Sequence, residues 1–183
     1  MIEKIKNNEA TVLSHLNSQE KLAWLMKEYG NDIIRIAYTY LKQEQLAEDV
    51  AQEVFIKCYE KLDTFRNESS YKTWLIKITV NKCKDVLRSW SYRNLLVTDF
   101  IRENLISYSK EPKEIDDKKE LVSSKVIELP VKLREVIILY YFQELTIEEI
   151  SELLEVHSTT VRTRMHRGRL KLKEMFKGES NHG

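Results

Sequence analysis

A basic stretch near the end of the chain carries the side chains best suited to binding a polyanion. From Arg162 to Lys177 the chain has seven Lys or Arg residues and a single acid, Glu174. A guanidinium group can donate two parallel hydrogen bonds to a guanine edge or to a phosphate, so this composition favours nucleic-acid contacts over acid–base chemistry. Because the whole chain has a net charge of only +1, locally segregated charge would have to attract the DNA.

Helical periodicity sorts this basic stretch into two faces. The side chains expected to pack against preceding helices are Val161, Met165, Gly168, Leu172 and Met175. The opposite side presents the side chains that we expect to read bases, namely Arg162, Thr163, His166 and Arg167. The cations expected to contact phosphates or solvent are Arg164, Arg169, Lys171 and Lys173. The alternative is that this basic face is exposed to solvent and binds nothing, and that His166 is an exposed histidine without a function.

A short acidic helix is predicted immediately before the basic one. Residues 145–154 contain three glutamates and no base, and Thr146 is placed to cap the helix. A turn of three or four residues around Glu155 then leads into the basic stretch. Two helices at this spacing, the second one basic, are what a helix-turn-helix needs to place one helix in the DNA major groove.

The first half of the chain predicts a bundle of amphipathic helices. Apolar residues recur every three or four positions from about residue 20 to 42, where the pattern allows a break at Gly30, and again over 45–62. Residues 63–70 are rich in side chains that compete with a helix for backbone hydrogen bonds, so we predict a loop there. Ser69 or Ser70 at its end would cap a third helix over residues 71–88.

Composition supports an all-α protein with two small helical domains joined by a flexible charged linker. Only 4 glycines and 2 prolines are available for turns. Residues 110–120 hold nine charged residues and a proline, which marks the linker region. The expected boundaries are an N-terminal arm at 1–19, a first helical domain at 20–92, the linker at 93–113, a helix-turn-helix domain at 114–177 and a tail at 178–183.

Little in the sequence favours catalysis or a cofactor. Cys58 and Cys83 lie far apart in apolar helical patterns, so we expect reduced core thiols and no metal site. The sequence shows no Gly-rich phosphate loop and no clustered carboxylate and histidine set, so no cofactor is expected and an enzyme has little support. The N-terminus has no apolar signal core and no run is long enough to span a membrane, so we expect a cytoplasmic protein.

Motifs in both halves together resemble one family. In the first half they are Ala47–Phe55 and Phe65–Leu75, and in the second half Leu129–Pro130, Leu133–Val136, Leu145–Ile150 and Thr160–Arg169. The chain resembles the extracytoplasmic-function class of bacterial sigma factors, the small two-domain promoter-recognition subunits of RNA polymerase. The resemblance covers about residues 20–92 and 114–176.

The resemblance implies a set of functional surfaces. The residues that would dock on the clamp coiled coil of core RNA polymerase are Asp49, Gln52, Glu53 and Ile56. Those that would capture the −10 promoter element are Arg66, Asn67, Ser69, Tyr71, Lys72, Trp74, Lys77, Asn81, Lys84 and Arg88. Those that would read the −35 element are Ser158, Thr160, Arg162, Thr163, His166 and Arg167. The resemblance also implies an anti-sigma factor as a partner, often a membrane-bound one.

Several alternatives stay open at this point. Tyr71 and Trp74 have a spacing that is also typical of core residues. The family often has Gly where this chain has Glu155 and Thr159, and both residues tolerate a positive φ poorly. A stand-alone helix-turn-helix regulator would explain the second half of the chain, but it gives no reason for the polar loop and basic helix after Phe65.

Overall fold

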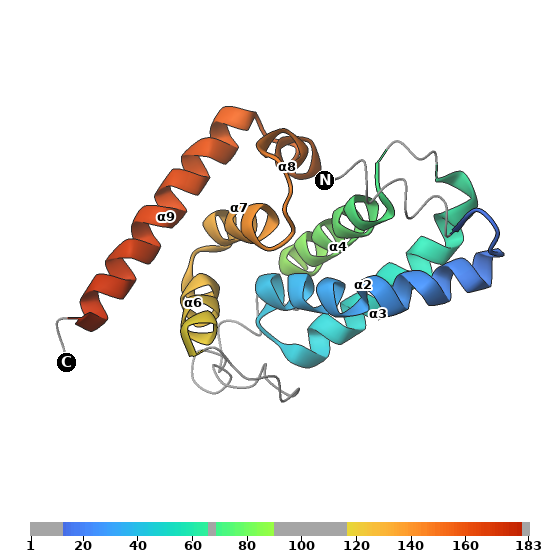
Figure 1. Ribbon diagram of the computed structural model, residues 1–183, viewed down its shortest axis with the longest axis horizontal. Coiled ribbons are helices and arrows are strands. Elements are labelled where there is room, and N and C mark those ends of the chain that lie inside the picture. The colour runs from blue at the N-terminus through green and yellow to red at the C-terminus, as the bar shows by residue number, and fades with distance from the viewer. Residues whose placement is uncertain (1–12, 66–68, 90–116, 181–183) are drawn as a thin grey trace. The chain divides into compact units, whose positions relative to one another are not determined.

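The computed structural model describes residues 13–65, 69–89 and 117–180. Every regular element in these ranges is a helix, which confirms the all-α prediction (Figure 1). The chain divides into two compact units, Met1–Asn104 and Leu105–Gly183. None of the helices in the described ranges combines the length and the apolarity needed to cross a membrane.

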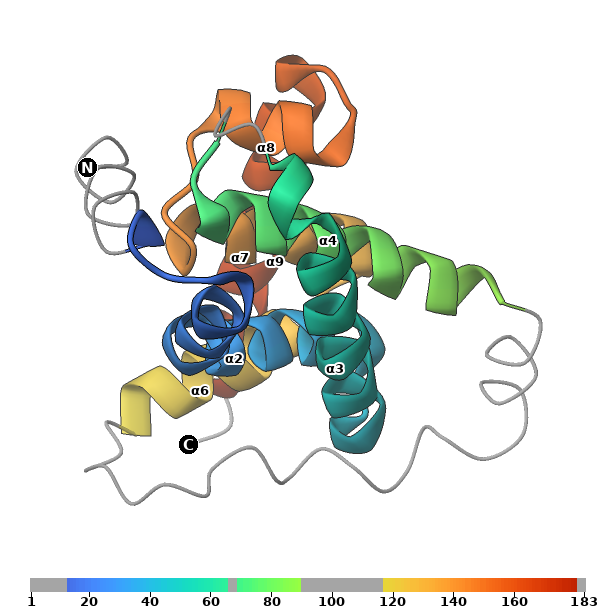
Figure 2. The same cartoon turned by 90° about the vertical axis from the view of Figure 1, so that its right-hand side faces the viewer.

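Among the residues described for the first unit, three α-helices pack around one apolar core. They are α2 (Ser18–Leu41), α3 (Glu44–Lys61) and α4 (Tyr71–Arg88), with the short 3-10 helix η1 (Leu62–Thr64) after α3 (Figures 1 and 2). The side chains at the centre of this core are Leu25, Ile33, Ile36, Ala47, Val50, Val54, Leu75, Ile76 and Val80. Burying a large aliphatic side chain stabilises the fold by about 1.5–3 kcal/mol, so this core holds the three helices together.

Helix α2 is fixed at both ends by its caps. The Asn17 side chain accepts hydrogen bonds from the backbone N–H groups of Gln19 and Glu20, each at 3.0 Å, and Glu20 Oε2 accepts one from the Asn17 N–H at 2.9 Å. Lys42 ends the helix with a φ of 57°, which turns the chain sharply into α3. The break that the pattern allowed at Gly30 does not occur, because burial of Tyr29 and Ile33 on either side outweighs the roughly 1 kcal/mol that Gly costs in a helix.

Part of the predicted N-terminal arm belongs to the folded unit. Leu13 is only 2% exposed, and the Ser18 hydroxyl donates to Asp63 Oδ1 at 3.3 Å. The start of α2 is therefore tied to η1, the segment that leads into the 63–70 loop. Residues 1–12 of the arm, the linker at 93–113 and the end of the tail lie outside the described residues.

The second unit contains helices α6 (Asp117–Glu128), α7 (Val131–Tyr141), α8 (Ile147–Leu154) and α9 (Ser158–Ser180). Its core gathers side chains of all four helices, namely Val126, Leu129, Val136, Ile137, Leu139, Ile150, Leu153, Val161 and Met165. Arg134 is buried among them, where it donates to the carbonyl of Leu129 at 3.1 Å and to that of Ile127. A guanidinium here satisfies carbonyls that the end of α6 would otherwise leave without donors.

Candidate nucleic-acid interface and docking surface

Thr146 caps the start of α8, as the sequence predicted, and Glu149 completes a capping box with it. Thr146 Oγ1 accepts from the Glu149 N–H at 3.2 Å, and Glu149 Oε2 accepts from the Thr146 N–H at 2.8 Å. The turn after α8 passes through Glu155, which has a φ of 56° and a ψ of 47°. Ser151 Oγ braces this turn by donating to the Val156 carbonyl at 2.6 Å. Glu155 therefore occupies the left-handed position for which the family often uses Gly, whereas Thr159 lies within α9.

The packed face of α9 is the one that periodicity predicted. Val161, Met165 and Gly168 are buried, and Leu172 and Met175 are half-buried. A Cβ added at Gly168 would lie 3.1 Å from Ile137 Cγ1, so Gly168 lets α9 approach α7 closely. This contact determines which side of α9 faces away from the other helices of the second unit.

The predicted base readers lie on the free side of α9. Arg162, Thr163, His166 and Arg167 are exposed, and the side chains of His166 and Arg167 form no hydrogen bond or ion pair with the described residues. Thr163 Oγ1 donates to the Thr159 carbonyl at 2.8 Å. Ser158 and Thr160, at the start of the helix, are half-buried.

Two arginines of α9 form ion pairs with neighbouring helices. Arg162 Nη2 donates to Glu148 Oε1 of α8 at 3.0 Å, and both side chains are well exposed. Arg164 Nη1 donates to Glu135 Oε1 of α7 at 2.9 Å, where the Glu135 side chain is only 5% exposed. The expectation that Arg164 faces phosphate or solvent is wrong, because a buried carboxylate of the same unit holds its guanidinium. The sequence did not predict Glu148 and Glu135 as partners of these arginines, because they lie 14 and 29 residues away on other helices.

An aromatic cluster forms where the 63–70 loop meets α4. The Phe65 ring lies 4.3 Å from that of Tyr71 and 4.9 Å from that of Trp74, between ring centroids. Tyr71 is buried, whereas Phe65 and Trp74 are half-buried and keep part of their surface open to solvent. Ser70 caps α4, its Oγ accepting from the Thr73 N–H at 3.1 Å. Arg66 and Asn67, at the tip of the predicted loop, lie outside the described residues.

Polar and cationic side chains continue along α4 from this cluster. Lys77, Asn81 and Arg88 are exposed, and Lys72, Lys84 and Ser69 are half-buried. Arg88 has an acidic neighbour, Asp85, with 3.7 Å between Nη1 and Oδ1. Both side chains of this pair are largely exposed, so the contact would be weak in water and leaves Arg88 able to exchange partners.

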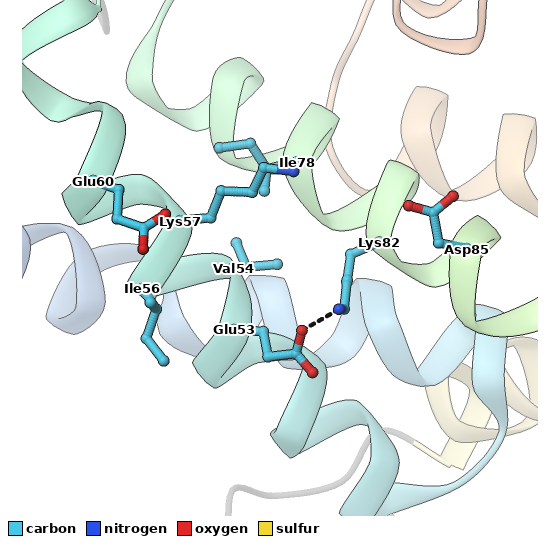
Figure 3. Close-up of a pocket in the computed structure, with 8 residues that line it drawn as sticks. All are labelled: Glu53, Val54, Ile56, Lys57, Glu60, Ile78, Lys82 and Asp85. Carbon is cyan, nitrogen blue, oxygen red and sulfur yellow. Dashed lines mark ion pairs between the residues drawn. The ribbon is translucent and has the colours of Figure 1, made fainter.

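A shallow groove of about 310 Å³ runs between α3 and α4 (Figure 3). The residues that line it are Glu53, Val54, Ile56, Lys57, Glu60, Ile78, Lys82 and Asp85. Glu53 forms an ion pair with Lys82 across the groove. Asp49 and Gln52 are exposed on α3, and Ile56 is 60% exposed, an unusual position for an isoleucine.

The two cysteines lie inside the first unit, as expected. Both are buried and free of disulfides, and burial raises the pKa of each thiol to about 12. A thiol that stays protonated at neutral pH is a poor nucleophile and a poor metal ligand. Among the described residues no group of three His, Cys, Asp or Glu side chains is arranged to hold a metal ion.

Comparison with known proteins identifies both units. The family model for sigma-70 region 2 matches residues 25–91, and that for sigma-70 region 4 matches residues 120–172. The chain is 33% identical to the ECF RNA polymerase sigma factor SigW of Bacillus subtilis over 87% of its own length and 90% of SigW. The chain belongs to the extracytoplasmic-function group of the sigma-70 family. The sequence had predicted this family from its motifs, and the prediction is confirmed.

A second sequence relative supports the same family, and two solved structures support the same fold. The chain is 32% identical to the RNA polymerase sigma factor SigV of Bacillus subtilis, over 80% of its own length and 85% of SigV. A solved structure of the sigma factor RpoE in complex with the anti-sigma factor NepR, from Bartonella quintana, shares the fold with a TM-score of 0.69 at 21% identity, covering 87% of this chain and 96% of RpoE. The structure of CnrH in complex with the cytosolic domain of CnrY gives a TM-score of 0.63 at 21% identity, with 97% of each chain covered.

Proposed function

We propose that this sigma factor directs core RNA polymerase to a two-part promoter, with its region 4 unit reading the −35 element and its region 2 unit opening the −10 element. The observation that carries the proposal is the free face of α9. There Arg162, Thr163, His166 and Arg167 follow a capped helix and a tight turn, the arrangement that places a helix N-terminus against base edges. Side chains on a packed helix are positioned more precisely than side chains on a loop.

The −10 proposal uses the aromatic cluster and the helix behind it. Capture of an unstacked base needs an aromatic surface, and cations are needed to follow the backbone. Trp74 and Phe65 would offer that surface with the buried Tyr71 as support, and Arg66, Asn67 and Ser69 would contact base edges or backbone. The side chains proposed to follow the single strand along α4 are Lys72, Lys77, Asn81, Lys84 and Arg88.

The polymerase-docking proposal rests on the exposed side of α3. Ile56 is exposed beside the carboxylates of Asp49 and Glu53 and the amide of Gln52. An apolar side chain ringed by polar groups is the composition of an interface centre and its rim. We propose that this surface docks on the clamp coiled coil of the polymerase, which would supply most of the affinity for promoter DNA. The near-neutral charge of the chain is then no obstacle to DNA binding.

The proposal extends to regulation and location. Two solved structures that share the fold are complexes, one of CnrH with the cytosolic domain of CnrY and one of RpoE with the anti-sigma factor NepR. By analogy, we propose that an anti-sigma factor binds this chain, that the chain works in the bacterial cytoplasm, and that such a partner holds it at the membrane when the partner is membrane-bound. In this role the chain is a non-catalytic specificity subunit that needs no cofactor.

Gel filtration separates this proposal from a stand-alone regulator. The purified chain is mixed with core RNA polymerase, and its elution is followed with and without the core enzyme. Migration of the chain into the polymerase peak is the expected result, because a sigma factor needs the core enzyme to act. A chain that elutes as a dimer, binds duplex operator DNA and does not bind the core enzyme would instead be a stand-alone regulator.

A further inference from the structure

The ion pair between α8 and α9 places a carboxylate beside a predicted base reader. Arg162 Nη2 donates to Glu148 Oε1 at 3.0 Å, with side-chain exposures of 62% and 66%. Arg162 is in the second turn of α9, on the same free face as Thr163 and His166. The carboxylate therefore lies at the surface that would face DNA, where an unpaired acid would be repelled by phosphates.

The helix cap explains why this acid is free to reach across. Thr146 and Glu149 use each other's side chains to close the start of α8. Glu148 takes no part in that capping box, so its side chain extends toward α9. The contact joins the two helices of the helix-turn-helix directly, across the turn at Glu155.

The geometry points to Glu148 as a positioning and specificity-determining residue that orients Arg162 for one base of the −35 element. This inference rests on the proposed function of α9. An arginine carries five N–H donors, and the bond to Glu148 uses one hydrogen of Nη2. The other Nη2 hydrogen and those of Nη1 stay available for O6 and N7 of a guanine. Holding one side of the guanidinium restricts its rotation, so less freedom is lost when the paired hydrogen bonds to the base form.

This role predicts opposite effects on specific and non-specific binding. Replacing Glu148 by Gln removes a negative charge from the DNA face and weakens the hold on Arg162, because an amide oxygen accepts a weaker hydrogen bond than a carboxylate does. Arg162 can then contact phosphates of any sequence more readily. Affinity for non-specific DNA should rise slightly, and preference at one base pair should fall. A residue that only stabilised the fold would, when replaced, lower both.

The test uses holoenzyme assembled from the full chain and core RNA polymerase, with promoter fragments in which the −35 element is randomised. Bound fragments are sequenced for the wild type and for Glu148→Gln, Arg162→Ala and the double variant. Glu152→Gln is the matched control, because Glu152 lies one turn further along α8, is exposed and forms no ion pair with the described residues. Melting curves of each variant confirm that it is folded.

We expect the wild type to prefer guanine at one position, and Glu148→Gln to reduce that preference roughly fivefold or more with the other positions unchanged. Arg162→Ala should abolish the same preference, and adding Glu148→Gln to it should change nothing further. An unchanged preference in Glu148→Gln, a loss at a different position from Arg162→Ala, or an equal loss at all positions would each overturn the inference. A wild-type holoenzyme without any −35 preference would instead refute the proposed function.

Discussion

Glu135 of α7 and Arg164 of α9 form an ion pair, with 2.9 Å between Oε1 and Nη1. The Glu135 side chain is 5% exposed and that of Arg164 20%, so the pair is largely removed from water. Glu135 follows Arg134, which holds the end of α6 through the Leu129 carbonyl. Two adjacent charged residues of α7 thus connect it to α6 and to α9.

Replacing Glu135 by Ala should destabilise the region 4 unit by about 2–4 kcal/mol, because Arg164 would be left partly buried without its carboxylate. The unit contains no tryptophan, so amide hydrogen exchange of α7 and α9 is the appropriate measurement. Replacing both partners, as in Glu135→Leu with Arg164→Met, should cost less than the single change. If the hydrogen-exchange protection of Glu135→Ala equals that of the wild type, the ion pair does not contribute to the stability of the unit.

The turn of the helix-turn-helix should become more stable when Glu155 is replaced by Gly. The left-handed conformation at φ 56° costs a side chain about 1 kcal/mol, of which part is lost again to the greater freedom of Gly in the unfolded chain. We expect a gain of roughly 0.5 kcal/mol in the protection of α8 and α9 amides. Thr159→Gly, inside α9, should do the opposite and cost roughly 0.5–1 kcal/mol; a gain there would contradict the assignment of the strained position.

Arg167 should behave as a base reader. Arg167→Ala should weaken holoenzyme binding to the preferred −35 element by roughly 1–3 kcal/mol and relax the preference at one position. Lys171→Ala, an exposed cation further along α9, serves as the comparison and should weaken all sequences alike. Equal losses on every sequence for Arg167→Ala would make Arg167 a phosphate contact.

Substitutions on the exposed surface of α3 should weaken binding to core RNA polymerase and leave binding to −35 DNA unchanged. Gln52→Ala combined with Glu53→Ala should weaken binding to core RNA polymerase by roughly tenfold or more, measured by titration of labelled chain. Lys82→Ala breaks the Glu53–Lys82 pair and leaves the acid in place, so it isolates the effect of the pair itself. If Lys82→Ala weakens binding as much as the double variant, the acids act by shaping α3 and α4, not by contacting the polymerase.

The buried thiols make the region 2 unit sensitive to high pH. Burial raises the pKa of Cys58 and Cys83 from 9.0 to about 12 in the folded state, so between these values the unfolded chain loses thiol protons that the folded chain keeps. The contribution of the buried thiols to the free energy of unfolding is therefore fully present below pH 9, and it is lost as the pH rises toward 12. Denaturation followed by Trp24 and Trp74 fluorescence should show this slope, and Cys58→Ala should reduce it. A Cys58→Ala slope equal to that of the wild type would contradict a thiol origin.

Local features of this structure could be predicted from the sequence, and long-range ones could not. The caps at Thr146 and Ser70 and the close approach at Gly168 follow from hydrogen bonds and periodicity within a few residues. The partners of Arg162 and Arg164 lie 14 and 29 residues away on other helices, and no spacing rule selects them. The groove between α3 and α4 is also a product of packing, although the exposed Ile56 on an otherwise polar face was a signal.

Run-off transcription tests the central claim most directly. Core RNA polymerase is supplied with the purified chain and with templates carrying the promoter elements that the holoenzyme selects from the randomised fragments. We predict a discrete transcript that requires the chain, the −35 element and the −10 element together. The absence of any transcript, while a control sigma factor initiates with the same core enzyme on its own promoter, would contradict the assignment of this chain as a promoter-specificity subunit.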